Sequence, residues 1–358
     1  MKKSSSLMFL CCFLLLTTSC VKDKKIIDEI QITQGIAVDK SDEKNYRFTS
    51  FYPIHNEGDK TEYKTVSVLG DSTKEARIQL NEATQKPIFS GKLSTLLFSY
   101  KVAENGINEM IDTLQRDPTI GRDVIVAVTK GKSGPYLIND LGFNQGNARY
   151  IYDLIKNNQE AGNLPTTDLH QFLFMYFSEG KEPILPYVIL TEGNIRLAGL
   201  ALFKKDKVKS IVSRDDLFLF RAMYEDFKTG SYQVKFKDEK LMLQNVASKV
   251  NYDIGKGQVP SVKINIRIKG YISEEVNGDL PISDQIKQYK KEMEKQIEHD
   301  CQELLAKLQE ENLDSLGIGE QVRMRRRDWK NKEWKEMYKD VSIQVNCDVE
   351  ILHSGIVS

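Results

Sequence analysis

The stretch VKINIRIKGYI, Val262–Ile272, alternates apolar and polar side chains along its length. This period of two is typical of a β-strand with one face in a protein core and the other in water. The apolar face carries Val262, Ile264, Ile266 and Ile268, and the polar face carries Lys263, Asn265, Arg267 and Lys269. We therefore expect a strand whose apolar face needs a cover.

The segment that can supply this cover follows in the sequence. From Ser283 to about Glu311 apolar side chains recur every three or four positions, which predicts an amphipathic helix roughly 43 Å long. Its stripe consists of Ile286, Tyr289, Met293, Ile297, Cys301, Leu304 and Leu308. A second alternating stretch, Val341–Leu352, follows it near the end of the chain. These elements predict a C-terminal α+β domain, residues 196–358, with the long helix across an antiparallel or mixed sheet.

Shorter strands and helices alternate before this domain. The patterns predict strands at Ile30–Lys40, Tyr46–Ile54, Lys92–Val102 and Asp123–Gly131, and helices at Ser72–Thr84 and Ile107–Asp117. Ser72 or Thr73 is the expected N-cap of the first helix. Such an alternation of strands and helices is typical of an α/β layer.

A hairpin follows a stretch without a clear pattern. The glycine-rich segment GKSGPYLINDLGFNQG, Gly131–Gly146, lacks the spacing of a phosphate-binding loop, so we expect a plain loop. A helix at Thr166–Gly180, capped by Thr166 or Thr167, precedes three expected strands, Glu182–Leu190, Ile195–Lys205 and Lys207–Ser213. We place an N-terminal region at residues 20–195, with two sub-domains that divide between residues 130 and 180.

The chain begins MKKSSSLMFLCCFLLLTTSC, an uncharged run preceded by two lysines. The run Ser4–Cys20 has 17 residues, which is the lower limit for a membrane span and suits an export signal. The small residues Thr17, Thr18 and Ser19 come before Cys20, whose thiol can carry a diacylglycerol. We predict a signal peptide at residues 1–19 and lipid attachment at Cys20; the alternatives are an ordinary secreted protein and an uncleaved anchor.

Charge and composition limit the function classes. Cleavage before Cys20 leaves 339 residues with 49 basic and 51 acidic side chains, so nothing favours nucleic-acid binding. The 40% of hydrophobic and 28% of charged residues are ordinary for a globular protein. No later stretch approaches a second membrane span. We expect a folded body outside the cytoplasm, held to the membrane by lipid at one end.

No catalytic or metal-binding motif emerges. The four histidines, His55, His170, His299 and His353, are scattered. The sequence EHDC, Glu298–Cys301, has two interpretations, a metal site or a solvated helix face with Cys301 turned inward. We favour the solvated face, because neighbours in a helix point in different directions. Arg214–Asp216 reads as the start of a helix capped by Ser213. No serine or cysteine stands in a nucleophile motif. We therefore expect neither an enzyme nor a cofactor.

Two local features have alternative interpretations. The basic run Arg323–Lys335 contains Trp329 and Trp334. One interpretation is a surface that contacts anionic lipids or a membrane partner. The other, which we favour, is a helix that packs its tryptophans inward and its charges outward. Cys301 and Cys347 lie on apolar faces, which favours buried thiols, although a bridge between them is possible outside the cytoplasm.

Several stretches together resemble the C-subunit lipoproteins of bacterial spore germinant receptors, the Ger(x)C family. They are CVKDKKIIDEIQITQGIAVDK from Cys20, TLQRDPTIGRDVIVAVTKG from Thr113, GLALFKKDKVKSIVSRDDLFLFRAM from Gly199 and DSLGIGEQVRMRRRDWKNKEWKEMY from Asp314. The resemblance spans essentially all of the chain after the predicted signal.

The resemblance implies three consecutive α+β sub-domains, each with its own sheet. It also implies a lipid anchor at Cys20 on the outer face of the inner spore membrane, and a non-catalytic role beside two integral membrane subunits that sense nutrients. Direct nutrient binding is left open. The alternative is a stand-alone extracytoplasmic solute-binding lipoprotein, which we rank second because such proteins usually have two similar lobes around a cleft. An extracytoplasmic hydrolase ranks third.

Overall fold

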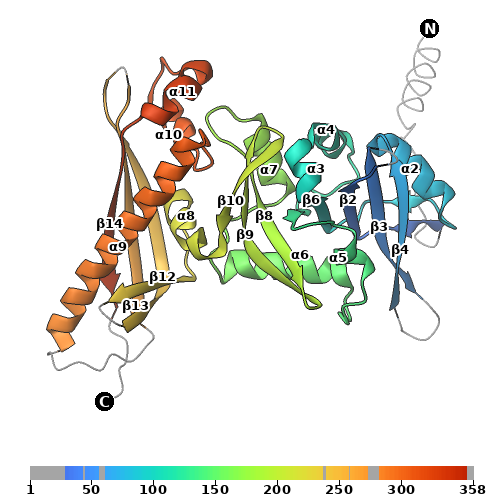
Figure 1. The fold of residues 1–358 in the computed structure, drawn as a ribbon, viewed down its shortest axis with the longest axis horizontal. Helices are drawn as coiled ribbons and strands as arrows, with labels where there is room; N and C mark the ends of the chain where they lie inside the picture. Colours follow the sequence, from blue (N-terminus) through green and yellow to red (C-terminus); the bar gives the residue numbers. More distant parts are fainter. Residues whose placement is uncertain are drawn as a thin grey trace, which may run out of the picture.

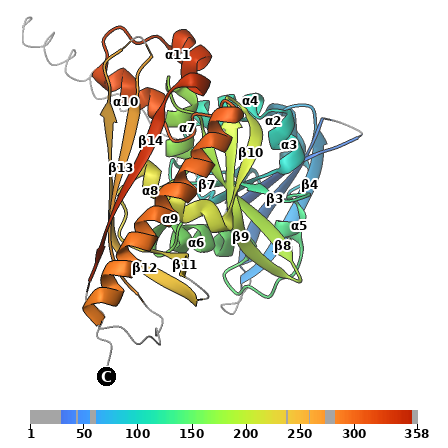
Figure 2. The ribbon, with the colours of Figure 1, turned by 60° about the vertical axis from the view of Figure 1, so that its left-hand side comes forward.

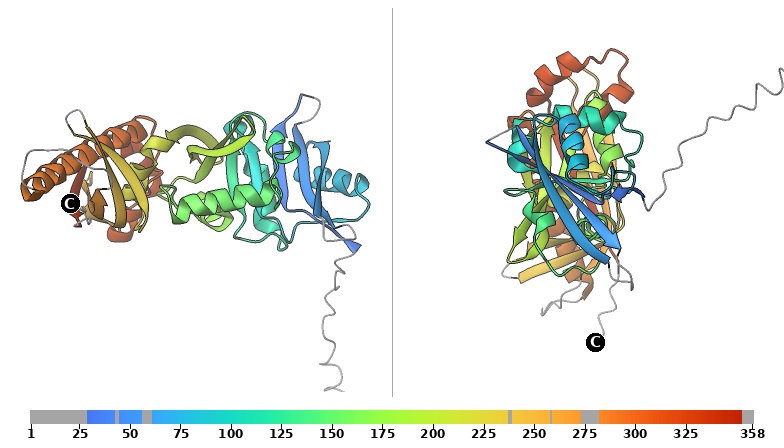
Figure 3. Two further views of the ribbon diagram at one scale, coloured as in Figure 1. Left: turned by 90° about the horizontal axis from the view of Figure 1, so that it is seen from below. Right: turned by 90° about the vertical axis from the view of Figure 1, so that its right-hand side faces the viewer.

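The computed structural model describes residues 29–42, 45–55, 61–236, 239–257, 259–272 and 282–352. In these ranges the strands form an eight-stranded sheet, a four-stranded sheet and a small pair. The two larger sheets lie along an elongated molecule, with the four-stranded sheet at one end (Figures 1 and 3). The α+β class is therefore confirmed.

The eight-stranded sheet has the order β10-β9-β8-β7-β6-β2-β3-β4. Its strands are β2 Gly35–Lys40, β3 Tyr46–His55, β4 Thr61–Gly70, β6 Thr95–Ser99, β7 Ile125–Thr129, β8 Ile184–Thr191, β9 Asn194–Lys204 and β10 Lys207–Ser213. The neighbours β2, β6, β7 and β8 are parallel, and both edges are antiparallel. The pair β1 Gln31–Ile32 and β5 Ile88–Phe89 lies outside this sheet.

Two groups of strands that we expected in separate sub-domains share this one sheet. They meet where β7 pairs with β8, at Val128 with Tyr187 and at Thr129 with Val188. The chain between β7 and β8 contains the interval from residue 130 to 180 in which we predicted the boundary, and that boundary stays a prediction. The sheet is therefore continuous but narrow at the expected division. The division of the chain near residue 195 stays a prediction, since β8 and β9 form one hairpin there.

Helices cover both faces of the sheet (Figure 1). On one side are α2 Thr73–Glu82, α3 Tyr100–Asn105, α4 Asn108–Arg116 and α7 Leu169–Phe177, and on the other are α5 Pro135–Ile138 and α6 Asn147–Glu160. Strands β6 and β7 are buried at every position, because successive side chains enter the two opposite cores.

The four-stranded sheet has the order β11-β12-β13-β14, with β13 and β14 parallel. Its elements are β11 Gly230–Phe236, β12 Glu239–Ile254, β13 Val262–Ile272, α9 Ile282–Glu310, α10 Ile318–Arg325, α11 Asn331–Met337, η3 Tyr338–Asp340 and β14 Ile343–Ile351. Helix α9 runs across this sheet (Figure 2). The stripe from Tyr289 to Leu308 and the apolar face of β13 are buried against each other, as predicted.

Helix α8, Leu217–Tyr224, connects the two sheets after the short turn η2, Arg214–Asp216. Its residues from Leu217 to Met223 are all buried. It contacts β10 of the large sheet and also β12, β13 and α9. Most of these side chains are apolar, and the buried Arg221 is paired with Glu225 at 2.9 Å, so the helix can be buried on every side. The core of the large sheet therefore continues through α8 into the C-terminal sheet.

Some expected boundaries were wrong. The strand expected at Lys92–Val102 ends at Ser99, whose side chain caps α3 instead. Helix α7 is capped by Asp168 rather than by Thr166 or Thr167, whereas Ser72 does cap α2 and Ser213 does cap η2. Helix α6 lies in the stretch that showed no clear pattern. Strands β4 and β12 were not foreseen: β4 is largely polar, and a register shift between Asn245 and Ala247 interrupts β12.

A buried carboxylate joins β2 to the glycine-rich segment. Both oxygens of Asp39 accept hydrogen bonds: Oδ1 from the backbone N–H and hydroxyl of Ser133 at 2.6 and 3.0 Å, and Oδ2 from the N–H of Gly134 at 2.8 Å. Asp39 and Ser133 are almost inaccessible to solvent. The predicted plain loop is therefore fixed to the sheet just before α5.

We expect Asp39→Ala to lower the free energy of unfolding by about 2–4 kcal/mol, because it leaves buried N–H groups without an acceptor. Chemical denaturation of the purified chain measures this change. Asp215→Ala is the matched control, since the Asp215 side chain is 87% exposed. Equal stability of the two variants would contradict a structural role for Asp39.

Candidate functional site

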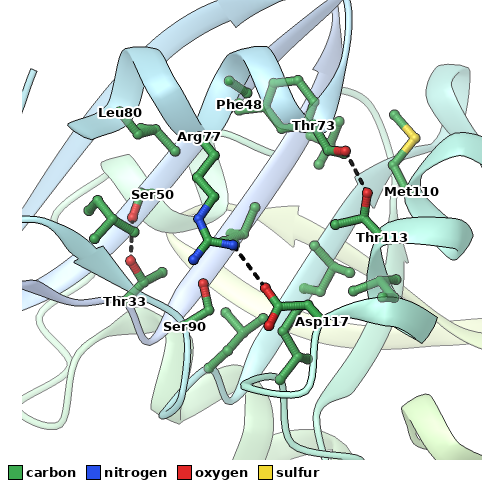
Figure 4. A pocket seen from close by; sticks show the side chains of 18 of the residues that line it. Thr33, Phe48, Ser50, Thr73, Arg77, Leu80, Ser90, Met110, Thr113 and Asp117 are labelled. Atoms are coloured by element: carbon green, nitrogen blue, oxygen red, sulfur yellow. Dashed lines mark hydrogen bonds and ion pairs between the residues drawn. The ribbon is translucent and has the colours of Figure 1, made fainter. Parts of the chain in front are cut away.

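A cavity of about 100 Å³ lies between α2, α4 and the sheet (Figure 4). Most of its wall is apolar, with contributions from Val38, Phe48, Leu80, Leu96, Phe98 and Met110. It sits beside the small side chain of Ala76, which is 2% exposed and faces the sheet from α2. A hollow of this size among aliphatic and aromatic side chains is suited to an apolar group.

An ion pair marks the place where the cavity reaches the surface. Arg77 Nη1 on α2 donates to Asp117 Oδ2, at the end of α4, over 3.1 Å. The Arg77 side chain is 50% exposed, whereas that of Asp117 is only 12% exposed. Both residues line the cavity, and Figure 4 shows the Arg77 side chain in the middle of the view with its guanidinium directed at Asp117. The cavity thus combines an apolar interior with two opposite charges at its rim.

The Asp117 carboxylate is fixed independently of Arg77. Its Oδ1 accepts hydrogen bonds from the backbone N–H and the hydroxyl of Thr119, at 2.9 and 2.6 Å. Partial burial acts to raise the pKa of Asp117, but these hydrogen bonds and the charge of Arg77 outweigh it and hold the pKa below its usual value. Asp117 therefore carries its negative charge at neutral pH.

Two pairs of hydroxyl groups lie in the cavity wall. The hydroxyl oxygens of Thr33, in the segment before β2, and Ser50, on β3, are 2.9 Å apart. Those of Thr73 on α2 and Thr113 on α4 are 2.6 Å apart. Each hydroxyl has the other as its partner, so the wall holds polar atoms without leaving them unsatisfied. The second pair also connects α2 to α4, the two helices that line the cavity opposite the sheet.

The junction between the two sheets contains a second group of buried charges. The carboxylate of Asp314 accepts from the N–H groups of Ile318 and Gly319, both at 2.7 Å, and from Trp334 Nε1 at 2.9 Å. Burial raises the pKa of Asp314 to about 6, although the three hydrogen bonds act in the opposite direction. This carboxylate joins the segment after α9, the start of α10 and α11.

Lys181 lies on the other side of this junction. Its Nζ is 4.0 Å from the centre of the Tyr224 ring, and its stem packs against Gly317. Burial lowers the pKa of Lys181 to about 8, despite the opposing negative charges of Asp314, Glu225 and Glu320. Nearby, Gly180 has a φ of 79° and its carbonyl accepts from the N–H of Glu320; a Cβ there would meet the backbone of Gly319.

The structure separates the two tryptophans of the basic run. Trp334 is on α11 and is 2% exposed, as the inward-packing interpretation predicted. Trp329 precedes that helix, so the two do not share a helix face, and its indole lies half-buried beside a hollow of about 370 Å³. Several basic side chains of the run form ion pairs, namely Arg323 with Glu320, Arg326 with Asp328 and Lys330 with Glu333.

The other candidate residues lie apart from the cavity. Cys301 and Cys347 are buried free thiols; burial raises the pKa of both, so they stay protonated and unreactive. Glu298 accepts the N–H of Cys347 at 2.8 Å and so joins α9 to β14, while Cys301 turns inward. His299, Asp300 and Glu303 are close enough to share an ion, but His299 and Glu303 are exposed.

Cys20 and His353 lie outside the described residues. Within the described ranges, no helix is long and apolar enough to cross a membrane. Sequence patterns did not reveal the cavity, because Arg77 and Asp117 are 40 positions apart and meet only through the packing of α2 on α4. The one available signal was Ala76, a small residue on the apolar side of a predicted helix.

We expect Trp334→Phe to lower the free energy of unfolding by about 1.5–3 kcal/mol, because it removes a hydrogen bond to the buried Asp314 carboxylate. Trp329→Phe is the matched control, since Trp329 Nε1 has no hydrogen-bond partner among the described residues. Denaturation midpoints measure both. Equal losses would show that the indole N–H of Trp334 contributes nothing specific.

The stability of the chain should rise between about pH 8 and pH 10.5 through Lys181. In this window the unfolded chain keeps a proton on Lys181 that the folded chain has released, so increasing pH favours the folded state. Thermal unfolding across this range should show a smaller rise for Lys181→Met than for the natural chain. Lys64→Met, at an exposed position on the edge strand β4, should follow the natural profile.

Comparisons with known proteins cover nearly the whole chain. Residues 23–190 match the family model "Spore germination protein N-terminal domain", and residues 198–355 match "Spore germination B3/GerAC like, C-terminal". The chain is 29% identical to spore germination protein GerQC of Bacillus cereus, over 94% of this chain and 95% of that protein. It is 20% identical to spore germination protein B3 of Bacillus subtilis (strain 168), over 96% of each.

A solved structure has the same fold. The crystal structure of the GerBC protein superimposes with a TM-score of 0.62 at 16% identity, and the match covers 89% of this chain and 97% of GerBC. The two family models account for both halves of the chain, from the residues just after the predicted lipid site almost to the end. The chain therefore belongs to the Ger(x)C family of spore germination proteins.

Proposed function

We propose that this chain is the lipid-anchored, non-catalytic C subunit of a spore nutrient germinant receptor, and that it works with two integral membrane subunits. The observation that carries the proposal is the match of both family models, which together span nearly all of the chain after the predicted signal. The predicted lipid attachment at Cys20 would hold the body on the outer face of the inner spore membrane.

The chemistry of the described residues supports a non-catalytic role. The buried carboxylates of Asp39 and Asp314 accept hydrogen bonds from backbone N–H groups and serve as structural links. The buried thiols have raised pKa values. None of these groups is paired with a base in the manner of an activated nucleophile.

Cys20→Ala should release the protein from membranes, because it removes the only predicted acceptor of the lipid. Cys11→Ala is the matched control, since Cys11 lies inside the apolar run of the signal. Fractionation of sporulating cells, with a radiolabelled fatty acid to follow lipidation, measures the effect. Retention of the Cys20→Ala protein in membranes would mean that an uncleaved signal or a protein partner supplies the anchor.

The receptor role is tested in spores that lack the gene. Loss of germination with one group of nutrients, while other nutrients still act, would support the receptor role and identify the signal. Complementation with Cys20→Ala then asks whether anchoring is needed. Normal germination with every nutrient in the deletion strain would favour the stand-alone solute-binding lipoprotein, unless a second receptor for the same nutrient is found.

A further inference from the structure

We propose that a group of lysines on the β9–β10 hairpin and on α11–η3 lies against the headgroups of anionic phospholipids and so fixes the orientation of the folded body on the membrane. This basic patch consists of Lys204, Lys205, Lys207, Lys209, Lys335 and Lys339. The inference rests on the proposed lipid anchor, because the anchor brings a membrane within reach, and it adds a second, electrostatic contact.

The two parts of the patch meet through Asn312. Lys204 Nζ donates a hydrogen bond to the backbone carbonyl of Asn312 over 2.8 Å, and Asn312 Nδ2 donates to the backbone carbonyl of Lys335 over 3.4 Å. The hairpin belongs to the large sheet, whereas Asn312 and α11 follow the long helix α9. The patch therefore forms only where these two parts of the molecule come together.

The lysines of the two parts influence one another electrostatically. Burial is the main cause that lowers the pKa of Lys204, and the positive charges of Lys335, Lys339 and Lys209 act in the same direction, against the negative charge of Glu182. Like charges that are close together raise the free energy of the fold unless an opposite charge compensates them. An anionic surface would supply that compensation.

Compensation from within the chain is weak. In the described ranges none of the six lysines forms an ion pair, whereas Arg323, Arg326 and Lys330 of the basic run each pair with a carboxylate. After the predicted cleavage the chain has 49 basic and 51 acidic side chains, so the surface outside the patch carries a net negative charge. An anionic membrane attracts the patch and repels the rest, which favours one orientation.

The hairpin turn also presents a lysine where another residue would fit the backbone better. Lys205 has a φ of 57°, in the left-handed region that favours glycine or asparagine. The next residue, Asp206, directs its carboxylate toward the end of α3, where a Cβ on Gly106 would be 2.5 Å from Asp206 Oδ2. The turn therefore exposes the lysine at its tip and directs the acid away from it.

Protection of a sheet edge does not explain the whole patch. Lysines on an edge strand prevent pairing with other chains, and Lys207 and Lys209 lie on the edge strand β10. Lys335 lies on α11 and Lys339 on η3, where there is no edge to protect. These two lysines need a different explanation, and a shared anionic surface accounts for both groups.

A lipid surface fits the patch better than a protein partner does. The predicted lipid site at Cys20 is nine positions before Glu29, so the described body begins within about 30 Å of the membrane. All six side chains are lysines, which act as hydrated point charges, whereas arginine is preferred for paired contacts with protein carboxylates. The hollow beside Lys335 measures only about 10 Å³ and leaves no room for an anchoring side chain.

Lysine footprinting of the natural, lipid-anchored chain in nanodiscs tests the proposal. A water-soluble acetylating reagent modifies exposed lysines, and mass spectrometry measures the rate at each position. We expect Lys205, Lys207 and Lys335 to react at least about threefold more slowly in nanodiscs that contain phosphatidylglycerol than in phosphatidylcholine alone. The difference should disappear in about 1 M sodium chloride, where the Debye length falls to about 3 Å. Lys64 and Lys235, which are exposed elsewhere, should react equally in both lipids.

A pair of triple variants separates the patch from net charge. The patch variant carries Lys205→Gln, Lys207→Gln and Lys335→Gln, and the remaining Lys209 and Lys339 should then react as fast in phosphatidylglycerol as in phosphatidylcholine. The control variant carries Lys64→Gln, Lys235→Gln and Lys249→Gln, three exposed positions outside the patch, and has the same net charge. It should keep the protection of the natural chain. Thermal unfolding checks that both variants are folded.

Four results would overturn the proposal. They are equal reactivity of the patch lysines in the two lipids, protection that persists at high salt, equal loss of protection in the two triple variants, or protection that appears only when other receptor subunits are present. The last result would assign the patch to a protein partner.

The same experiment tests the anchor separately. Each of the four results leaves the lipid anchor intact, because anchoring is measured by the presence of the chain in the nanodiscs. A chain that is absent from phosphatidylcholine nanodiscs would contradict the anchor. Cosedimentation of that chain with phosphatidylglycerol vesicles, at low and at high salt, would then measure the contact of the patch by itself.

Discussion

The structure depends on helix α8, which is buried on every side between the two large sheets. Its apolar side chains pack against both sheets, so the two sheets share one hydrophobic core instead of having two separate ones. Removing such a helix from either sheet would expose a large apolar surface, and that cost fixes the two sheets relative to each other.

Around α8, charged groups give the junction its geometry. The Asp314 carboxylate accepts hydrogen bonds from the N–H groups of Ile318 and Gly319 and from the indole of Trp334. Lys181 lies over the ring of Tyr224 from the side of the large sheet. Apolar surfaces can shift slightly against each other at little cost, whereas the same shift would break hydrogen bonds to a buried carboxylate. The apolar core thus holds the two parts together, and these polar contacts define how they meet.

The cavity is lined by α2, α4 and neighbouring strands. Figure 1 shows α2 and α4 away from α8, toward the other end of the large sheet. The cavity is close to the small pair of β1 and β5, and Ile88 of β5 lines it. The C-terminal sheet and its basic segment lie at the other end of the molecule.

Local sequence periodicity determined the elements with a clear apolar face. Strand β13, helix α9, strand β14 and the caps at Ser72 and Ser213 follow from short-range patterns, because a side chain's direction within a strand or helix depends only on its spacing. The α+β class and the family resemblance follow from the same stretches. Strand β12 gave no continuous pattern, since a register shift between Asn245 and Ala247 interrupts its alternation.

Tertiary structure alone decided the rest. It joined the strands on both sides of the β7–β8 junction into one sheet. It also brought Asp39 into hydrogen-bonding contact with Ser133, 94 positions away, and Arg77 into contact with Asp117 beside the cavity. These contacts connect residues whose local sequences contain no sign of each other. The sequence by itself determined which faces had to be buried; which partner buries each face is set by long-range packing, where shape and charge are matched only in the folded chain.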